Sequence, residues 1–279
     1  MTPKFIKEKA RHIIWKKDIN QLNGNLIKLN ITSSGIENET PYVLIDDLFF
    51  YGPYNRNQEI FLEKFLEKKV RNKICTSTIF AALHINTIIK ESGDYLRHYN
   101  LKKGDIVVDA GANIGVITVI FSKKVGDTGK IIAIEPEEEN LRLLEMNIKK
   151  HSLKNVIVIK KGLYCKKDKK LLTLHSSGDH TLYDKFMREG EKVAIEVDTL
   201  DNLLKELKIE KVDFIKMDIE GAEIDAIKGM EKTLLKKPKL VIAAYHLHDG
   251  EPTYKVLAPY LRELGYNIKI GPKGFIYSE

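Results

Sequence analysis

The stretch "VVDAGANIGVIT" (Val107–Thr118) decides the fold. An apolar run reaches Asp109, and Gly111 and Gly115 follow where a helical pattern begins, near Ile114. A strand that turns into a helix in this way places its acid at the carboxyl edge of a sheet, where open α/β sheets bind ligands. The glycines permit a tight turn and a close backbone approach. The stretch therefore predicts an α/β domain with a ligand site at this turn.

The sequence after Gly104 alternates short β-branched runs with longer amphipathic runs, which is typical of a parallel sheet covered by helices on both faces. We expect strands in "DIVVDA", "KIIAIEP", "NVIVIKK", "VDFIKMD" and "KLVIAAYH". We expect one helix in "PEEENLRLLEMNIKKHSL", with Pro136 in its first turn, and another in "EGAEIDAIKGMEKTLLKK".

Two segments depart from this alternation. Between the third and fourth strands, "LLTLH" and "VAIEV" predict an added strand pair joined by a polar loop, followed by a helix that starts near Thr199. At the C-terminus, "YNIKIGPKGFIYSE" predicts a hairpin that makes the last strand antiparallel. Residues 1–100 are harder to interpret: "YVLIDDLFFYG" suits a strand with a turn, "NQEIFLEKFLEKKVRNK" a helix, and "FAALHINTIIKESGDYLRHY" one or two helices.

Composition limits the partners. The 279 residues carry a net charge of +7, but the lysines are spread out and mixed with glutamates, without stacking aromatics. This pattern favours a solvated surface over a nucleic-acid surface, and leaves peripheral membrane contact open. Neither a membrane-spanning run nor a secretory signal is recognisable, and two cysteines offer no zinc cluster, so we expect a cytoplasmic protein. The oligomeric state is not indicated.

The amino-acid sequence of the turn indicates one cofactor. Glu135 closes the second strand twenty residues after Gly115, where a carboxylate can accept hydrogen bonds from ribose hydroxyls. The loop reads G-A-N-I-G instead of the dinucleotide pattern G-x-G-x-x-G, and Asp109 precedes it. An acid at this point repels a pyrophosphate but can pair with an ammonium group. S-adenosyl-L-methionine has an α-ammonium and no phosphate, so we expect it as the cofactor, with Asp109 facing the ammonium.

Several blocks together resemble the FkbM family of S-adenosylmethionine-dependent methyltransferases: "VVDAGANIGVIT", "IIAIEPEEENLRLLEMNI", "VDTLDNLL", "VDFIKMDIEGAEIDAIKGM" and "LVIAAYHLHD". The resemblance runs from about Gly93 to the C-terminus. It implies a Rossmann-like class I sheet of order 3-2-1-4-5-7-6 with strand 7 antiparallel, a methyltransferase domain over 93–279 and an N-terminal cap or lid over 1–92. It also implies methyl transfer, commonly to a hydroxyl oxygen of sugars or polyketide-like products. The alternatives are an RNA methyltransferase and a non-catalytic cofactor-binding module.

The expected cofactor contacts are the acids and loop residues at the strand ends: Asp109, Gly111, Asn113, Gly115, Glu135, Gly162 and Asp218. Tyr95 or His98, in the helix before the first strand, could line the methionine end. For the acceptor, which is a small molecule or a glycan, we expect contacts from His180, Tyr183 and His248.

A hydroxyl acceptor is a poor nucleophile until its proton is removed, so a general base should lie beside the methyl group. Asp218 ends the fourth strand and His246 the fifth, which makes Asp218 the expected acid of the site and His246 the base or its partner. Glu220 and Glu223 are further candidates, and either could instead stabilise a helix dipole. Asp218 and His246 could also ligate a divalent metal, but two ligands do not define a site, and we expect none.

Overall fold

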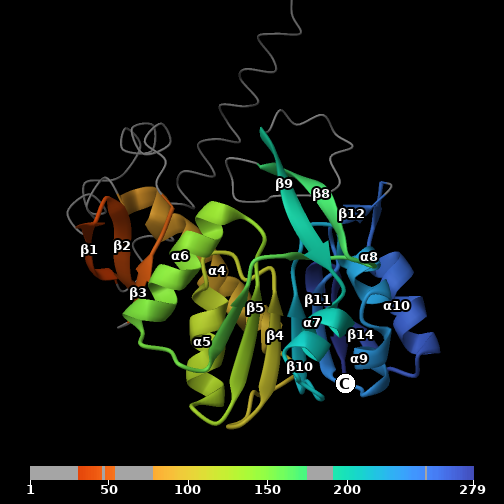
Figure 1. Ribbon diagram of the computed structural model, residues 1–279. Helices are drawn as coiled ribbons and strands as arrows, with labels where there is room; N and C mark the ends of the chain where they lie inside the picture. The colour runs from red at the N-terminus through yellow and green to blue at the C-terminus, as the bar shows by residue number, and fades with distance from the viewer. Residues whose placement is uncertain (1–30, 46–47, 54–77, 175–190, 249) are drawn as a thin grey trace, which may run out of the picture. The chain divides into compact units, whose positions relative to one another are not determined.

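The computed structural model of the protein describes residues 31–45, 48–53, 78–174, 191–248 and 250–279 (Figure 1). Its contacts divide the chain into two units, Met1–Lys90 and Glu91–Glu279, with the boundary inside helix α4 (Ile79–Tyr95). The sequence placed the boundary after residue 92. No helix of the described residues is long and apolar enough to cross a membrane.

In the first unit, three antiparallel strands form a small sheet in the order β1-β2-β3. They are β1 (Ile31–Glu37), β2 (Thr40–Ile45) and β3 (Leu48–Tyr51). The strand and turn predicted in "YVLIDDLFFYG" are therefore confirmed as β2 and β3. In "FAALHINTIIKESGDYLRHY", where one or two helices were predicted, the structure has one α-helix, α4, which ends at Tyr95. The helix expected in "NQEIFLEKFLEKKVRNK" lies outside the described residues.

The second unit is built on a seven-stranded sheet that runs β6-β5-β4-β10-β11-β15-β14. Numbered along the chain, this order reads 3-2-1-4-5-7-6. All pairs are parallel except those of β15, which is antiparallel to β11 and β14. The fold is thus the Rossmann-like α/β sheet that the sequence predicts. The strands are β4 (Ile106–Ala110), β5 (Lys130–Ile134), β6 (Val156–Ile159), β10 (Phe214–Met217), β11 (Lys239–Ala243), β14 (Ile268–Ile270) and β15 (Phe275–Ser278).

Alternate residues of the central strands face two different layers of helices, because side chains point to opposite faces of a strand in turn. Val108 and Met217 face one layer, in a core with α7 (Leu200–Glu206), α8 (Glu223–Lys228), α9 (Glu231–Leu235) and α10 (Tyr254–Glu263). On the other face, α5 (Val116–Val125) and α6 (Glu138–Lys150) cover the sheet (Figure 1). There Ala133 packs against Leu144 of α6. Asp109 of β4 faces this second layer.

The helix boundaries differ from the predictions in three places. α5 begins at Val116 rather than near Ile114. α6 begins after Glu137, whose carboxylate accepts hydrogen bonds from the N–H groups of Glu139 and Asn140, so Pro136 lies before the helix and not in its first turn. The single helix predicted over "EGAEIDAIKGMEKTLLKK" is two helices, α8 and α9. The break falls at Gly229, where an added Cβ would lie 2.1 Å from the carbonyl oxygen of Tyr164, so this chain crossing excludes a larger residue.

Both predicted departures from the alternation are confirmed. β8 (Asp168–Leu174) and β9 (Glu191–Asp198) form the added antiparallel pair, and α7 follows with Thr199 as its N-cap. A two-residue strand, β7 (Gly162–Leu163), also pairs with β9 and was not predicted. At the C-terminus, a short 3₁₀ turn over Pro272–Gly274 joins β14 to β15 in the predicted hairpin.

Candidate active site

The predicted site residues gather at the carboxyl edge of the central strands. Glu135 directly follows β5, Asp218 directly follows β10, and His246 lies three residues after the end of β11. Because parallel strands end at the same edge, residues far apart in the sequence meet there. The carboxyl ends of β4, β10 and β11 therefore form one functional region.

Beneath this edge lies a buried ion pair between adjacent strands. Asp109 of β4 and Lys216 of β10 are direct partners in the parallel register, and their side chains are 0% and 3% exposed. The Lys216 Nζ lies 3.1 Å from Asp109 Oδ1, and the Thr118 hydroxyl of α5 donates a 2.6 Å hydrogen bond to Oδ2. The charge on Asp109 is thus neutralised inside the protein.

Lys216 also holds the turn after β4. Its Nζ donates to the carbonyl oxygens of Gly111 at 2.7 Å and Ala110 at 3.3 Å, and lies 5.2 Å from the centre of the Tyr95 ring. Burial lowers the pKa of Lys216, but the charges of Asp109 and Asp218 outweigh this effect and leave the pKa above its ordinary value. Lys216 is therefore a fixed cation that ties the loop to the sheet.

Asp109 was expected to face the ammonium group of the cofactor, and that contact stays a prediction. In this structure the side chain has no exposed surface. Asp109 pairs with Lys216 and supports the loop from below.

The glycines of the loop are needed for contacts within the protein. Gly111 and Gly115 have φ angles of 75° and 85°, in the left-handed region that favours glycine. An added Cβ at Gly111 would lie 1.8 Å from the Asp218 carbonyl oxygen, and one at Gly115 would lie 2.5 Å from Leu144. The tight turn is confirmed, whereas the close approach at both glycines comes from the protein itself.

Glu135 is the carboxylate next to this loop. Its Oε2 accepts a 2.9 Å hydrogen bond from the N–H of Asn113, and its Oε1 accepts from the N–H of Glu137 at 3.1 Å and the side-chain amide of Asn140 at 3.4 Å. The residue is 6% exposed, and burial raises its pKa to about 7, against the lowering effect of these hydrogen bonds. Glu135 thus links the first and second strand ends and keeps a small exposed surface.

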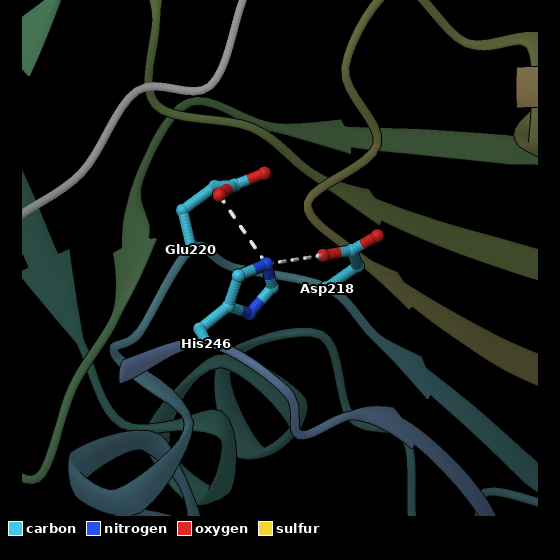
Figure 2. Close-up of side chains that lie close together, drawn as sticks. All are labelled: Asp218, Glu220 and His246. Atoms are coloured by element: carbon cyan, nitrogen blue, oxygen red, sulfur yellow. Dashed lines mark ion pairs between the residues drawn. The ribbon is translucent and has the colours of Figure 1, made fainter. Parts of the chain in front are cut away.

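A second cluster centres on the imidazole ring of His246. Its Nδ1 lies 2.8 Å from Oε1 of Glu223, a fully buried residue at the start of α8. Its Nε2 lies 3.6 Å from Asp218 Oδ1 and 3.3 Å from Glu220 Oε2. Figure 2 shows the carboxylates of Asp218 and Glu220 directed at this one nitrogen. The cluster brings together Asp218, Glu220 and His246, the catalytic residues predicted from the sequence, and the further candidate Glu223 lies behind the ring.

The charges around His246 decide what the ring can do. Burial lowers its pKa, but the hydrogen bond to Glu223 and the charges of Glu223, Asp218 and Glu220 outweigh burial and raise the pKa to about 10. The ring is therefore a cation at neutral pH and holds no free lone pair with which to take a proton. Of the two roles predicted for His246, the geometry supports that of partner to the acids.

Asp218 is held from the other side by Tyr95, the last residue of α4. The Tyr95 hydroxyl donates a 2.5 Å hydrogen bond to Asp218 Oδ2, and burial together with the charge of Asp218 raises the pKa of Tyr95 well above its ordinary value. Oδ1 has no hydrogen-bond partner among the described residues. One oxygen of Asp218 is thus fixed, and the other faces His246 and Glu220.

The remaining predicted residues are more scattered. Gly162 lies in β7, paired with Val197 and packed against Ile195, so its near neighbours belong to β9. His248 lies opposite Glu251 in a hairpin of β12 (Leu247–His248) and β13 (Glu251–Pro252). His180 and Tyr183 lie outside the described residues. Lys216 was not predicted as a site residue, although a lysine inside the otherwise apolar run "FIKM" is an unusual choice for a central strand and was a usable signal.

The chain is similar in sequence to known methyltransferases. The sequence profile described as "Methyltransferase FkbM domain" matches residues 109–268. "Methyltransferase 1" of Beauveria bassiana is 28% identical over 145 residues, which cover 45% of this chain and 58% of that protein. "31-O-demethyl-FK506 methyltransferase FkbM" of Streptomyces tacrolimicus is 25% identical over 186 residues, 56% of this chain and 71% of that protein. A crystal structure of a SAM-dependent methyltransferase from Aquifex aeolicus aligns with a TM-score of 0.38 at 22% identity, over 70% of this chain and 88% of that chain.

The buried ion pair predicts a non-additive effect on stability. Asp109→Asn leaves the Lys216 cation without its partner, so we expect the free energy of unfolding to fall by about 3–5 kcal/mol. The double variant Asp109→Asn with Lys216→Met removes both charges and should lose less than the sum of the single variants. Urea denaturation of the four proteins measures this coupling. Strictly additive losses would show that the pair contributes no interaction of its own.

Glu135 predicts a pH effect on stability with a definite sign. Its pKa is about 7 in the folded state, against 4.5 ordinarily, so the folded protein binds more protons between these values. This contribution to stability is complete below pH 4.5 and is lost as the pH rises through about 7, a fall of about 3 kcal/mol. In urea denaturation at pH 5 and pH 8, Glu135→Gln should lose less stability over this range than the wild type. Glu139→Gln, on the exposed side of α6, should follow the wild type, and equal pH slopes in all three proteins would contradict the prediction.

Proposed function

The chain belongs to the FkbM methyltransferase family, and from that premise we propose that it transfers a methyl group from S-adenosylmethionine to a hydroxyl oxygen of a small-molecule or glycan acceptor. The observation that carries the proposal is the cluster of Asp218, Glu220 and His246 at the same sheet edge as the glycine loop and Glu135. The glycine loop and Glu135 suit a nucleoside, and the cluster suits removal of a hydroxyl proton.

The loop and Glu135 fit the nucleoside end of the cofactor by their chemistry. A carboxylate can accept about four hydrogen bonds, and Glu135 accepts three from the described residues, so a ribose hydroxyl could supply the fourth. Asn113, whose φ of 51° turns the loop, joins Glu135 directly to the turn. When bound, S-adenosylmethionine supplies an electrophilic methyl group on a sulfonium.

The acidic cluster would activate the acceptor. A hydroxyl must lose its proton as its oxygen attacks carbon, and a positioned base typically contributes 10²–10⁴-fold to such a step. Asp218 and Glu220 form the accepting pair, while the His246 cation holds both carboxylates in place. Tyr95 fixes Oδ2 of Asp218, so that Oδ1 is the oxygen directed into the cluster. The chain's own residues thus orient the acceptor and receive its proton.

The charge of the cluster bears on the acceptor class. Three carboxylates surround a single imidazole ring, so the site is negative even with the ring protonated. Such a site repels the phosphates of RNA and accepts an uncharged, hydroxyl-rich molecule. The Streptomyces tacrolimicus relative is by its name an O-methyltransferase, which supports the same choice. His180, Tyr183 and His248 remain our candidates for contacts to the acceptor.

Cofactor binding tests the proposal directly. We expect S-adenosylhomocysteine to bind at one site per chain in isothermal titration calorimetry. Glu135→Gln should weaken binding by about tenfold or more, because it removes a charged acceptor of a hydrogen bond. Glu139→Gln is the matched control and should bind like the wild type. An absence of saturable binding to the wild type would remove the basis of the proposal.

Methyl transfer gives a separate prediction. With tritium-labelled cofactor and a pool of glycan and polyketide acceptors, Asp218→Asn should lower kcat by about 10²–10⁴-fold. S-adenosylhomocysteine should still bind this variant within a few-fold of the wild type, since the lost charge acts on the acceptor. A wild type that binds the cofactor but labels no acceptor would support a non-catalytic binding module instead.

A further inference from the structure

We propose that Asp218, Glu220 and His246 form a binding site for one divalent cation of the Mn²⁺ type, which holds and acidifies the acceptor hydroxyl. The role of the cation rests on the proposed methyl transfer. The cation site itself rests only on the geometry of these three side chains.

The three ligand atoms are arranged as a cation would need them. Asp218, Glu220 and His246 each offer one ligand atom within 4.8 Å of the others. Asp218 Oδ1 and Glu220 Oε2 lie 3.6 Å and 3.3 Å from His246 Nε2. Ligands about 2.1 Å from an octahedral ion are about 3 Å apart when adjacent and about 4 Å apart when opposite. The separations from the nitrogen fall in this range. Figure 2 shows that both carboxylates approach the same nitrogen of the ring.

Glu223 supplies an independent observation. A metal-bound histidine almost always donates its other ring N–H to a carboxylate or carbonyl, which fixes the ring and its tautomer. The fully buried Glu223 lies 2.8 Å from Nδ1 of His246 and is itself held by the N–H groups of Ile219 and Gly221. The ring is therefore anchored with Nε2 directed at Asp218 and Glu220, the orientation in which it would ligate an ion. An ion bound at Nε2 would displace the proton that this nitrogen otherwise carries.

Asp218 supplies a second observation in favour of a cation. Its Oδ1 is buried without a hydrogen-bond partner among the described residues, and a buried carboxylate oxygen in this state is costly. The charges point the same way, because the carboxylates of Asp218, Glu220 and Glu223 all lie around one imidazole ring. The nearby Lys216 does not offset these carboxylates, since it pairs with Asp109. A divalent cation between Asp218 and Glu220 satisfies both the oxygen and the charge.

The ligand types select the class of cation. Two carboxylates and one imidazole are a mixed oxygen and nitrogen set, without the thiolates that favour zinc in structural sites. Three protein ligands leave three octahedral positions for water or an acceptor. Mn²⁺ accepts both ligand types and this geometry, and it is the probe of choice.

The cation would take over part of the activation of the acceptor. A hydroxyl bound to a divalent cation is more acidic, because the cation stabilises the alkoxide. As the new oxygen–carbon bond forms and the sulfur–carbon bond breaks, the hydroxyl proton passes to the second oxygen of Glu220. Glu220 is the most exposed of the three ligands, at 32%, so it can release that proton to solvent. Asp218 and His246 then serve as ligands.

The test uses the full chain, freed of metal by dialysis against EDTA, and electron paramagnetic resonance of free Mn²⁺. We expect one Mn²⁺ to bind per chain. Asp218→Asn and Glu220→Gln should each weaken binding by at least tenfold, and Glu223→Gln by about 10–100-fold through the loss of the anchored ring. Glu231→Gln, an exposed acid at the start of α9, loses the same charge and should bind like the wild type. Thermal unfolding of each variant checks that it is folded. If Asp218→Asn does not fold, Glu220→Gln, in a partly exposed turn, decides the result.

Two results would overturn the proposal: no saturable Mn²⁺ binding up to about 1 mM, or equal affinity in the wild type and all variants, which marks adventitious binding. Calorimetry with S-adenosylhomocysteine on the same samples separates this failure from that of the proposed function. Cofactor binding and methyl transfer that persist in EDTA would remove the cation and leave the methyltransferase. Specific Mn²⁺ binding without cofactor binding would support the cation site and remove the basis of the proposed methyl transfer.

Discussion

The ion pair between Asp109 and Lys216 is the interaction on which the site depends. The two residues are register partners on the central strands β4 and β10, both are buried, and each has its charge met by the other. Removing two charges from water is costly, and only close pairing with further hydrogen bonds offsets that cost. Thr118 and the loop carbonyls supply those bonds. The pair therefore joins two strands, a helix and the glycine turn at one point, directly below the residues that would do the chemistry.

Two acids at neighbouring strand ends have different roles because their surroundings differ. Asp109 is fully enclosed and paired with a cation, so its charge is used within the fold. Glu135 is held by neutral N–H donors, so burial dominates and its pKa rises to about 7. The acid at the end of β10 is a third case: Asp218 is partly exposed, with one oxygen held by Tyr95 and the other without a donor. Only the last two keep surface for a ligand.

Much of the fold could be predicted because its signals are local. The strand pattern, the added pair β8 and β9, and the C-terminal hairpin all follow from apolar runs and turn residues. The failures come from contacts that no local pattern contains. At the break, Gly229 lies against the Tyr164 carbonyl, sixty-five residues earlier in the chain. The pairing of Asp109 with Lys216, on another strand, was likewise not predicted. Asp218 and His246 could be predicted because they follow adjacent strands. The hydrogen bonds from Tyr95 to Asp218 and between His246 and Glu223 could not be predicted from any local pattern.

The net charge of +7 illustrates why a global property is a poor guide to a site. Lysines near the added sheet pair with acids: Lys161 with Asp198 at 3.0 Å, and Lys166 and Lys170 with Asp168 at 3.7 Å each. The one buried cation near the glycine loop, among the described residues, is Lys216, and Asp109 cancels it. What remains at the carboxyl edge is the negative cluster around His246. Salt screens electrostatic interactions over short distances. An acceptor at that edge therefore interacts with the local carboxylates rather than with the positive net charge of the whole chain. The local sign, and not the total, therefore favours an uncharged acceptor over a polyanion.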